Sequence, residues 1–251
     1  GTGGHGHTFP GATTPFGMIQ LSPINGISGW DWCSGYHYSD SLVIGFGHLS
    51  LSGTGIGDLN DVVLMPATKE YDLSTLTIGK KDQYFKDADK FRDLVPYKSK
   101  YSHKNEKASV GYYQVYLETP KINAEFTADT YVGMHKYTFE KGDTQSIILN
   151  LGFAINWDNP TQMNIRQYIS DKDTSIHKNM IFGHRYSVGW AKNQKVFFAI
   201  EFSKDINNIK YNKDNDNVTS TQVFFDNTDE KLLVRVALSS VSVENAYENL
   251  N

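Results

Sequence analysis

The chain has 251 residues with a composition near the average of soluble proteins: 39% are hydrophobic, 21% are charged and the formal net charge is −4. Lysines are scattered rather than clustered, which excludes a basic surface for nucleic acid or an anionic membrane, and no apolar run approaches the roughly 20 residues of a membrane helix. The single cysteine, Cys33, excludes an internal disulfide framework and a cysteine-only zinc site, while 13% aromatic residues suit β-sheets and sugar-binding surfaces alike.

The first 60 residues form a glycine-rich segment. Residues 1–57 hold 14 of the 21 glycines and four of the eight histidines. Such glycine density disfavours regular secondary structure. Interleaved aromatic residues, among them Phe9, Trp30 and Tyr36, supply apolar area to bury, so the segment is expected to be ordered and to shape a surface.

Strands are predicted throughout the rest of the chain. Several alternate with period two, as Val196, Phe198, Ile200 and Phe202 do against their neighbours. Pro66 is expected to stop the first strand, and polar clusters at 140–143, 205–208 and 214–217 are expected to form turns. The pattern predicts a mostly-β antiparallel sandwich over residues 1–241, with strands at 62–65, 112–118, 124–131, 134–139, 146–151, 196–202, 222–225 and 232–238.

Two segments fall outside the strand pattern. Residues 79–107 are rich in Lys and Asp and are expected to form a long polar excursion. This excursion either contains one helical turn around 87–94 or is a solvated loop. Residues 242–250 place Val243, Ala246, Tyr247 and Leu250 at helical spacing behind the capping Ser242, which predicts a short amphipathic helix. Residues 242–251 are expected to begin a connection to a further domain.

The opening histidines allow two interpretations. His5 and His7 would lie on one side of an extended segment, where His37 or His48 would complete a metal site. Their spacing matches no zinc motif, and the alternative is a set of histidines hydrogen-bonded in a polar cleft wall. The glycines around them lack the Gly-Lys-Ser/Thr ending of a phosphate loop, which disfavours nucleotide binding.

Residues 29–40 carry the densest chemical signal. They combine aromatic faces for the C–H groups of a sugar with acceptors for its hydroxyls, which pyranose recognition requires. A core role for the tryptophans would leave Asp31, His37 and Asp40 in need of partners. Cys33 is either a nucleophile with an aligned base or, more commonly for this residue type, a small buried thiol. The aromatic residues of this stretch are Trp30, Trp32, Tyr36 and Tyr38.

Further along, His48, Ser50, Ser52 and Asp58 include the residue types of a hydrolase triad. Their spacing singles out no triad, and no Gly-x-Ser-x-Gly elbow is present.

Ordered motifs extend along the whole chain. They are HGHTFPGA at 5–12, PFGM at 15–18, GWD at 29–31, CSGYHYSD at 33–40, GF at 45–46, LSGTG at 51–55 and GD at 57–58, then YSH at 101–103, GYY at 111–113, GWA at 189–191 and VSVENA at 241–246. This series resembles the amino-terminal region of glycoside hydrolase family 92, the calcium-dependent exo-acting α-mannosidases. The resemblance implies a galactose-mutarotase-like antiparallel β-supersandwich, a helical linker and an (α/α)6-barrel domain, with the active site in the cleft between the domains.

The resemblance also implies an inverting mechanism, in which a glutamic acid protonates the leaving oxygen and an aspartate activates water. In the family these carboxylates and the calcium ligands come from the barrel domain, so no catalytic or metal residue is assigned to this chain. What carries over is a wall of the cleft, in which Trp30 and Asp31 hold a terminal mannose. The other residues implied in this wall are His5, Phe9, Cys33, Ser34, Tyr36 and His37.

The resulting expectation is the cleft-forming amino-terminal domain of an exported α-mannosidase, in the bacterial periplasm or at the cell surface. Terminal α-1,2-linked mannose of glycans is the expected substrate, the chain's own barrel domain is the expected partner, and this chain alone is expected to be inactive. Two alternatives stay open: a free-standing lectin-like module, and a structural domain whose exposed aromatic cleft docks a partner.

Overall fold

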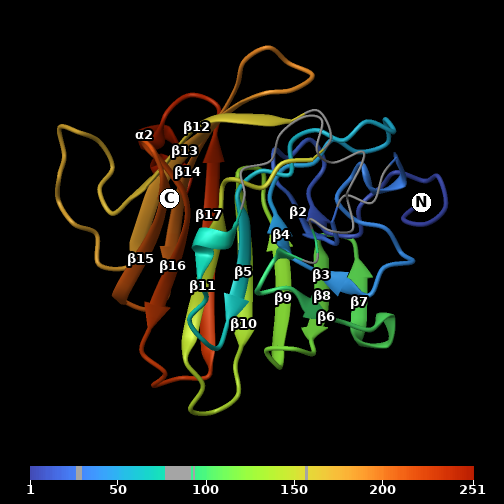
Figure 1. Ribbon diagram of the computed structural model, residues 1–251, viewed down its shortest axis with the longest axis horizontal. Helices are drawn as coiled ribbons and strands as arrows, with labels where there is room; N and C mark the ends of the chain where they lie inside the picture. The colour runs from blue at the N-terminus through green and yellow to red at the C-terminus, as the bar shows by residue number, and fades with distance from the viewer. Residues whose placement is uncertain (27–29, 77–91, 93, 156–157) are drawn as a thin grey trace.

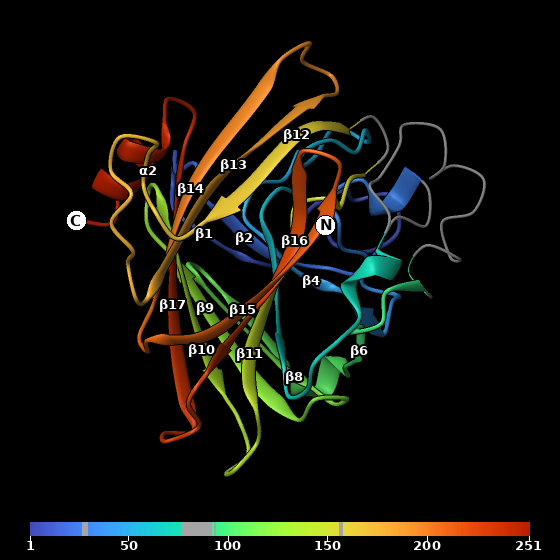
Figure 2. The same ribbon diagram turned by 60° about the vertical axis from the view of Figure 1, so that its left-hand side comes forward.

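The computed structural model describes residues 1–26, 30–76, 92, 94–155 and 158–251. Within these ranges the chain forms two large antiparallel sheets that enclose a common core, and a two-stranded ribbon (Figures 1 and 2). The predicted mostly-β supersandwich is confirmed.

One sheet has seven strands among the described residues, in the order β1-β2-β4-β5-β11-β16-β15. Its four N-terminal strands come from the first 67 residues, so the glycine-rich segment is built into the sheet. The strands are β1 (Ala12–Thr13), β2 (Gln20–Ile24), β4 (Gly45–Gly47), β5 (Val63–Ala67), β11 (Gln145–Asn150), β15 (Ile206–Asp214) and β16 (Asn217–Phe225).

The other sheet has eight strands in the described part of the chain, in the order β12-β13-β14-β17-β10-β9-β8-β7. Its strands are β7 (Glu106–Ser109), β8 (Tyr112–Leu117), β9 (Ile122–Ala128), β10 (Val132–Thr138), β12 (Asn159–Arg166), β13 (Met180–Val188), β14 (Gln194–Phe202) and β17 (Lys231–Ser239). The ribbon pairs β3 (Leu42–Val43) with β6 (Ser99–Lys100).

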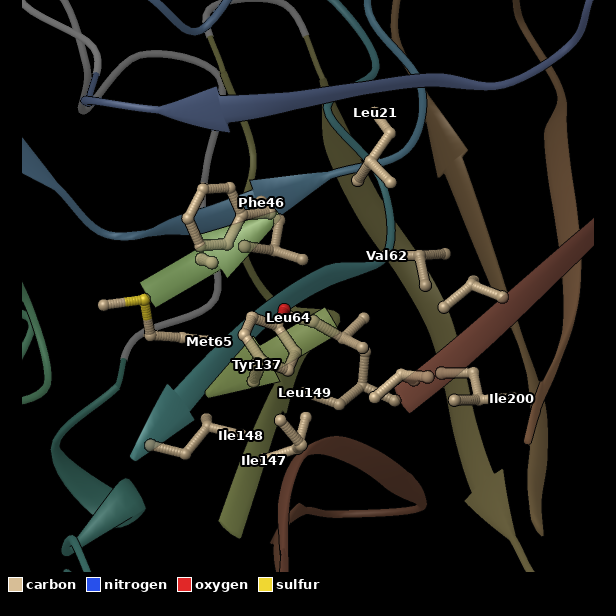
Figure 3. Close-up of a cluster of buried hydrophobic side chains, with 14 of the residues drawn as sticks. Leu21, Phe46, Val62, Leu64, Met65, Tyr137, Ile147, Ile148, Leu149 and Ile200 are labelled. Carbon is tan, nitrogen blue, oxygen red and sulfur yellow. The ribbon is translucent and has the colours of Figure 1, made fainter. Parts of the chain in front are cut away.

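The core fills the space between the sheets. Figure 3 shows side chains of β5, β11 and β14, such as Leu64, Leu149 and Ile200, gathered around Tyr137 of β10, and all four are fully buried. Burying one aliphatic side chain of this size contributes about 1.5–3 kcal/mol. This core makes the sandwich a rigid base for the loops at its edge.

All eight predicted strands overlap observed ones, but several strands were not predicted. β12 and β15 are edge strands in which polar residues outnumber apolar ones, so they lack a clear apolar alternation. In β13, Gly183 and the buried Arg185 interrupt the apolar pattern. Tertiary pairing therefore recruits segments whose local pattern is weak.

Three expectations were wrong. Pro66 does not end the first strand: β5 continues through it to Ala67, because β4 pairs with β5 only at Leu64 and leaves that side of Pro66 without a strand. Residues 205–208 are not a turn, since β15 begins at Ile206 and pairs with β16 through a bulge. The glycine-rich segment does contain regular structure, in β1 to β4.

The predicted amphipathic helix is confirmed as α2 (Val243–Glu248), with the Ser242 side chain accepting from the Asn245 amide at 3.1 Å. Val243, Ala246 and Leu250 are buried against β13, β14 and β17. The last part of the polar excursion contains strands rather than only loop, because β6 and β7 lie within residues 99–109. Most of its predicted helical turn, at 87–94, lies outside the described residues.

Candidate functional site

The candidate site lies in the glycine-rich segment, at one end of the long axis of the molecule and opposite β15 (Figure 1). Strands β2 and β4 fix the segment to the seven-stranded sheet. The 3-10 turn η1 (Trp30–Trp32) and the chain after it carry most of the predicted site residues. Short strands thus anchor the loops that present the polar and aromatic side chains.

Asp31 is the centre of a polar cluster. Its Oδ1 accepts from His5 Nδ1 at 2.7 Å and lies 3.2 Å from His7 Nε2. The hydrogen bond from His5 is the main reason that the pKa of Asp31 is lowered. Both histidines bond to the same oxygen, and Oδ2 has no bonding partner among the described residues. Asp31 therefore offers one oriented, ionised oxygen to a ligand hydroxyl.

Trp30 presents a large aromatic surface next to this carboxylate. Its side chain is 56% exposed, and its indole meets His7 edge-on with ring centroids 5.0 Å apart. Gly55 lies directly against the indole: a Cβ there would sit 2.6 Å from Cζ2 and Cη2. Gly55 also has φ +69°, so both the close approach and the backbone require glycine.

His37 and Trp32 stack behind this surface. Their ring centroids are 4.2 Å apart, and His37 Nε2 lies 3.1 Å from the Gly4 carbonyl, to which it donates. The Trp32 indole N–H donates to Asp40, which also binds Arg92 at 2.8 Å. These contacts tie the N-terminal loop to the 30–40 turn.

Glu106 organises the next two aromatic residues. It accepts from the hydroxyls of Tyr36 at 2.9 Å and Tyr113 at 2.7 Å, and from His103 Nδ1 at 2.5 Å. His103 stacks on the exposed Tyr38, with centroids 4.0 Å apart. Burial raises the pKa of Tyr36 above its usual range, so its hydroxyl stays a donor. Sequence reasoning missed Glu106 and His103, although the motif at 101–103 signals the second.

Three other predicted residues have less access to solvent. Cys33 and Ser34 are buried, and Phe9 is half-buried. The Ser34 hydroxyl donates to the Thr8 carbonyl at 3.0 Å, while its own carbonyl accepts from Ser50. Burial raises the pKa of the Cys33 thiol, which favours the buried-thiol interpretation over a nucleophile. Cys33 and Ser34, like Tyr36, lie beneath the exposed surface.

The residue types of a hydrolase triad are not assembled. The buried His48 bonds to the Val62 carbonyl and to His135. Asp58 instead accepts from the backbone N–H of Trp190 at 2.6 Å. This bond attaches the β13–β14 hairpin to the glycine-rich segment and positions Trp190, which is 58% exposed and was not predicted as a site residue.

A buried ionic cluster holds the site on the sandwich. Arg185 of β13 pairs with both Asp61 and Asp158, and its Nε donates to the Leu151 carbonyl at 2.8 Å. Burial raises the pKa of Asp61 above its usual range despite the opposing effect of Arg185. The cluster joins the end of the glycine-rich segment to the loop after β11. No sequence spacing indicates it, because its members are separated by up to 124 positions.

Solved structures of glycoside hydrolases share this fold. The whole chain superposes on 32% of a family GH92 α-mannosidase from Bacteroides thetaiotaomicron, solved with mannoimidazole, at 30% identity and a TM-score of 0.82. A GH92 glycosyl hydrolase matches 99% of the chain over 32% of its own length, at 23% identity and a TM-score of 0.77.

The glycosyl hydrolase family 92 N-terminal domain matches residues 1–239, and the chain belongs to this family. An uncharacterized secreted glycosidase of Arthroderma benhamiae is 26% identical over 148 residues, which are 58% of this chain and 17% of that protein. The chain thus spans a third or less of the relatives it matches. No helix in the described part of the chain is long and apolar enough to cross a membrane.

Proposed function

We propose that this chain forms one wall of the substrate cleft of an exo-acting α-mannosidase. The observation that carries the proposal is the pair of the exposed Trp30 indole and the Asp31 carboxylate, whose Oδ2 is left open by His5 and His7. The aromatic face suits the C–H groups of a mannose ring, and the ionised oxygen suits its hydroxyls. The mannosidase relative at 30% identity supports mannose as the sugar.

In this proposal the chemistry takes place on the rest of a longer, exported enzyme. That enzyme removes terminal α-1,2-linked mannose from glycans by inversion, with an acid and a base on a barrel domain that packs against this chain, connected through α2. Phe9, Cys33, Ser34, Tyr36 and His37 are proposed to shape the wall behind Trp30 and Asp31.

Calcium, when bound, would help to orient the sugar. The fit of this chain to calcium is poor: the described residues contain no group of three or more His, Cys, Asp or Glu arranged to hold a metal. The acidic residues Asp61 and Asp158 are already paired with Arg185. The calcium ligands are therefore proposed to lie outside this chain, and no role of its own residues depends on them.

The test measures hydrolysis of a terminal α-mannoside by the longer enzyme. Trp30→Ala and Asp31→Asn should lower kcat/KM by at least tenfold, the effect of losing roughly 1.4 kcal/mol. Tyr131→Ala is the matched control, since Tyr131 is 49% exposed but lies on the β9–β10 turn. Full activity of both site variants, or robust turnover by this chain alone, would refute the proposal.

The alternative is that this chain is a free-standing sugar-binding module, in which the same Trp30–Asp31 pair binds the sugar. Calorimetric titration of this chain with mannose separates the two. One wall of a cleft binds mannose very weakly, whereas a complete module reaches a saturation that Trp30→Ala abolishes.

A further inference from the structure

Edge strand β12 of one sheet faces the β15–β16 hairpin of the other, on the β15 side of the molecule (Figures 1 and 2). A polar hollow lies between them. Its volume is about 580 Å³, within the range of small-ligand sites. Its lining combines two tyrosines with amides and a carboxylate: Tyr168, Tyr211, Asn164, Gln167, Asn215 and Asp216.

The walls of this hollow are held in place by backbone and side-chain bonds. The Asn217 side chain accepts from the Met163 amide at 2.8 Å and so ties the hairpin to β12. Tyr211 is set on β15 by pairing opposite Thr221. Asn215 adopts φ +52° in the tight turn between β15 and β16. The hollow is therefore formed by connected elements of both sheets.

The Tyr168 ring is oriented in advance, and the backbone position of Tyr211 is fixed by its strand pairing. The Arg166 guanidinium lies 4.6 Å from the ring centroid of Tyr168, and it is itself held by Asp171 at 2.9 Å and by the Ile169 carbonyl at 3.0 Å. Tyr211 is 40% exposed. Both phenols line the hollow, and burial, with a contribution from the nearby Tyr168, raises the pKa of Tyr211. A preset ring loses little entropy when a ligand binds.

We propose that this hollow is a second carbohydrate-binding site, separate from the Trp30–Asp31 wall, which holds a pyranose unit of a glycan chain on Tyr168 and Tyr211. The rings suit sugar C–H groups, and the amides and Asp216 suit hydroxyls. The charges favour a neutral ligand, because Asp171 offsets Arg166 and Asp216 offsets Lys213 in the lining.

The proposed occupant is one pyranose unit of an α-mannan, and the neighbouring hollow does not extend the site. An adjoining hollow of about 450 Å³ shares Tyr211 and is also lined by Tyr71, Asp72 and Ser74, the same mixture of ring and polar groups. Lys210 and Asn212 in its lining point to the opposite face of β15 from Tyr211 and Lys213, so it is a separate hollow. This inference rests on the proposed function for its choice of an α-mannan as the ligand.

The test is affinity electrophoresis of this chain in native gels that contain a soluble α-mannan. The wild-type chain should be retarded, and Tyr168→Ala and Tyr211→Ala should each raise the apparent Kd about tenfold, which corresponds to ~1.4 kcal/mol. Tyr168→Phe, which keeps the ring, should be retarded like the wild type. Tyr131→Ala is the control for an exposed tyrosine elsewhere, and near-UV circular dichroism verifies the fold of every variant.

Absence of wild-type retardation, or equal retardation of the alanine variants, would overturn this second site. Loss of retardation in Trp30→Ala but not in the tyrosine variants would also overturn it and would place glycan binding at the first wall. The proposed function is tested separately, by hydrolysis with the longer enzyme. The failure of one proposal is therefore distinguishable from the failure of the other.

Discussion

Two buried neutral histidines, His48 and His135, make the stability of this domain sensitive to acid. His48 Nδ1 lies 2.6 Å from the Val62 carbonyl, which only accepts, so His48 donates there and its Nε2 accepts from His135 Nε2 at 2.8 Å. His135 Nδ1 then accepts from the Tyr137 hydroxyl at 2.7 Å. The bond between the histidines requires an unprotonated His48 Nε2, and the bond from Tyr137 requires an unprotonated His135 Nδ1, so both imidazoles are neutral.

The free-energy effect follows from the pKa values. Burial lowers the pKa of His48 from 6.5 to about 4, and lowers that of His135 well below its usual range. Above pH 6.5 both are neutral in the folded and unfolded states. As the pH falls from 6.5 towards 4, only the unfolded state gains protons, so the folded state loses stability. At pH 5 this amounts to about 2 kcal/mol for His48.

Urea unfolding at pH 7 and pH 5 measures this loss. His48→Gln keeps a donor for Val62 and an acceptor for His135 but cannot titrate. The decrease in the free energy of unfolding from pH 7 to pH 5 should be smaller in this variant than in the wild type by about 2 kcal/mol. An identical decrease in both proteins would refute the deduced protonation states, whatever the variant's stability at pH 7.

Two further predictions concern the attachment of the site. Gly53 and Gly55 both have positive φ, but nothing lies within 4 Å of a Cβ at Gly53, whereas one at Gly55 meets the Trp30 indole. Both alanine variants should therefore lose about 1–2 kcal/mol of stability. Only Gly55→Ala should shift the tryptophan fluorescence. An equal shift in both variants would contradict the contact between Gly55 and Trp30. Arg185→Met leaves Asp61 and Asp158 buried without their cation and should cost about 3–5 kcal/mol in urea unfolding; a loss below 1 kcal/mol would show that the cluster does not hold the loops.

The sequence predicted the architecture well where the signal is local. Alternation in segments such as β14 and β17 reports which residues face the core, because side chains of a strand alternate between faces. The helix α2 was predicted for the same reason, from Ser242 and the spacing of Val243, Ala246 and Leu250. β15 was missed because an edge strand exposes its polar residues and keeps no apolar stripe.

For the candidate site, the residue types at 29–40 indicated sugar recognition, but their arrangement depended on partners far away in the chain. His5 reaches Asp31 across 26 positions, and Trp190 reaches Asp58 across 132. The sequence could not show that Tyr36 is buried under the site, nor that Glu106 holds it.

The sequence alone thus determined the fold class and the terminal helix and indicated the region of the candidate site, because periodicity, capping and composition act over a few residues. Only the tertiary structure decided which oxygen of Asp31 the two histidines hold, which glycine lies against Trp30 and which cation pairs with Asp61 and Asp158. Those contacts depend on how the two sheets pair and pack, and that pairing is set by the whole core rather than by neighbouring residues.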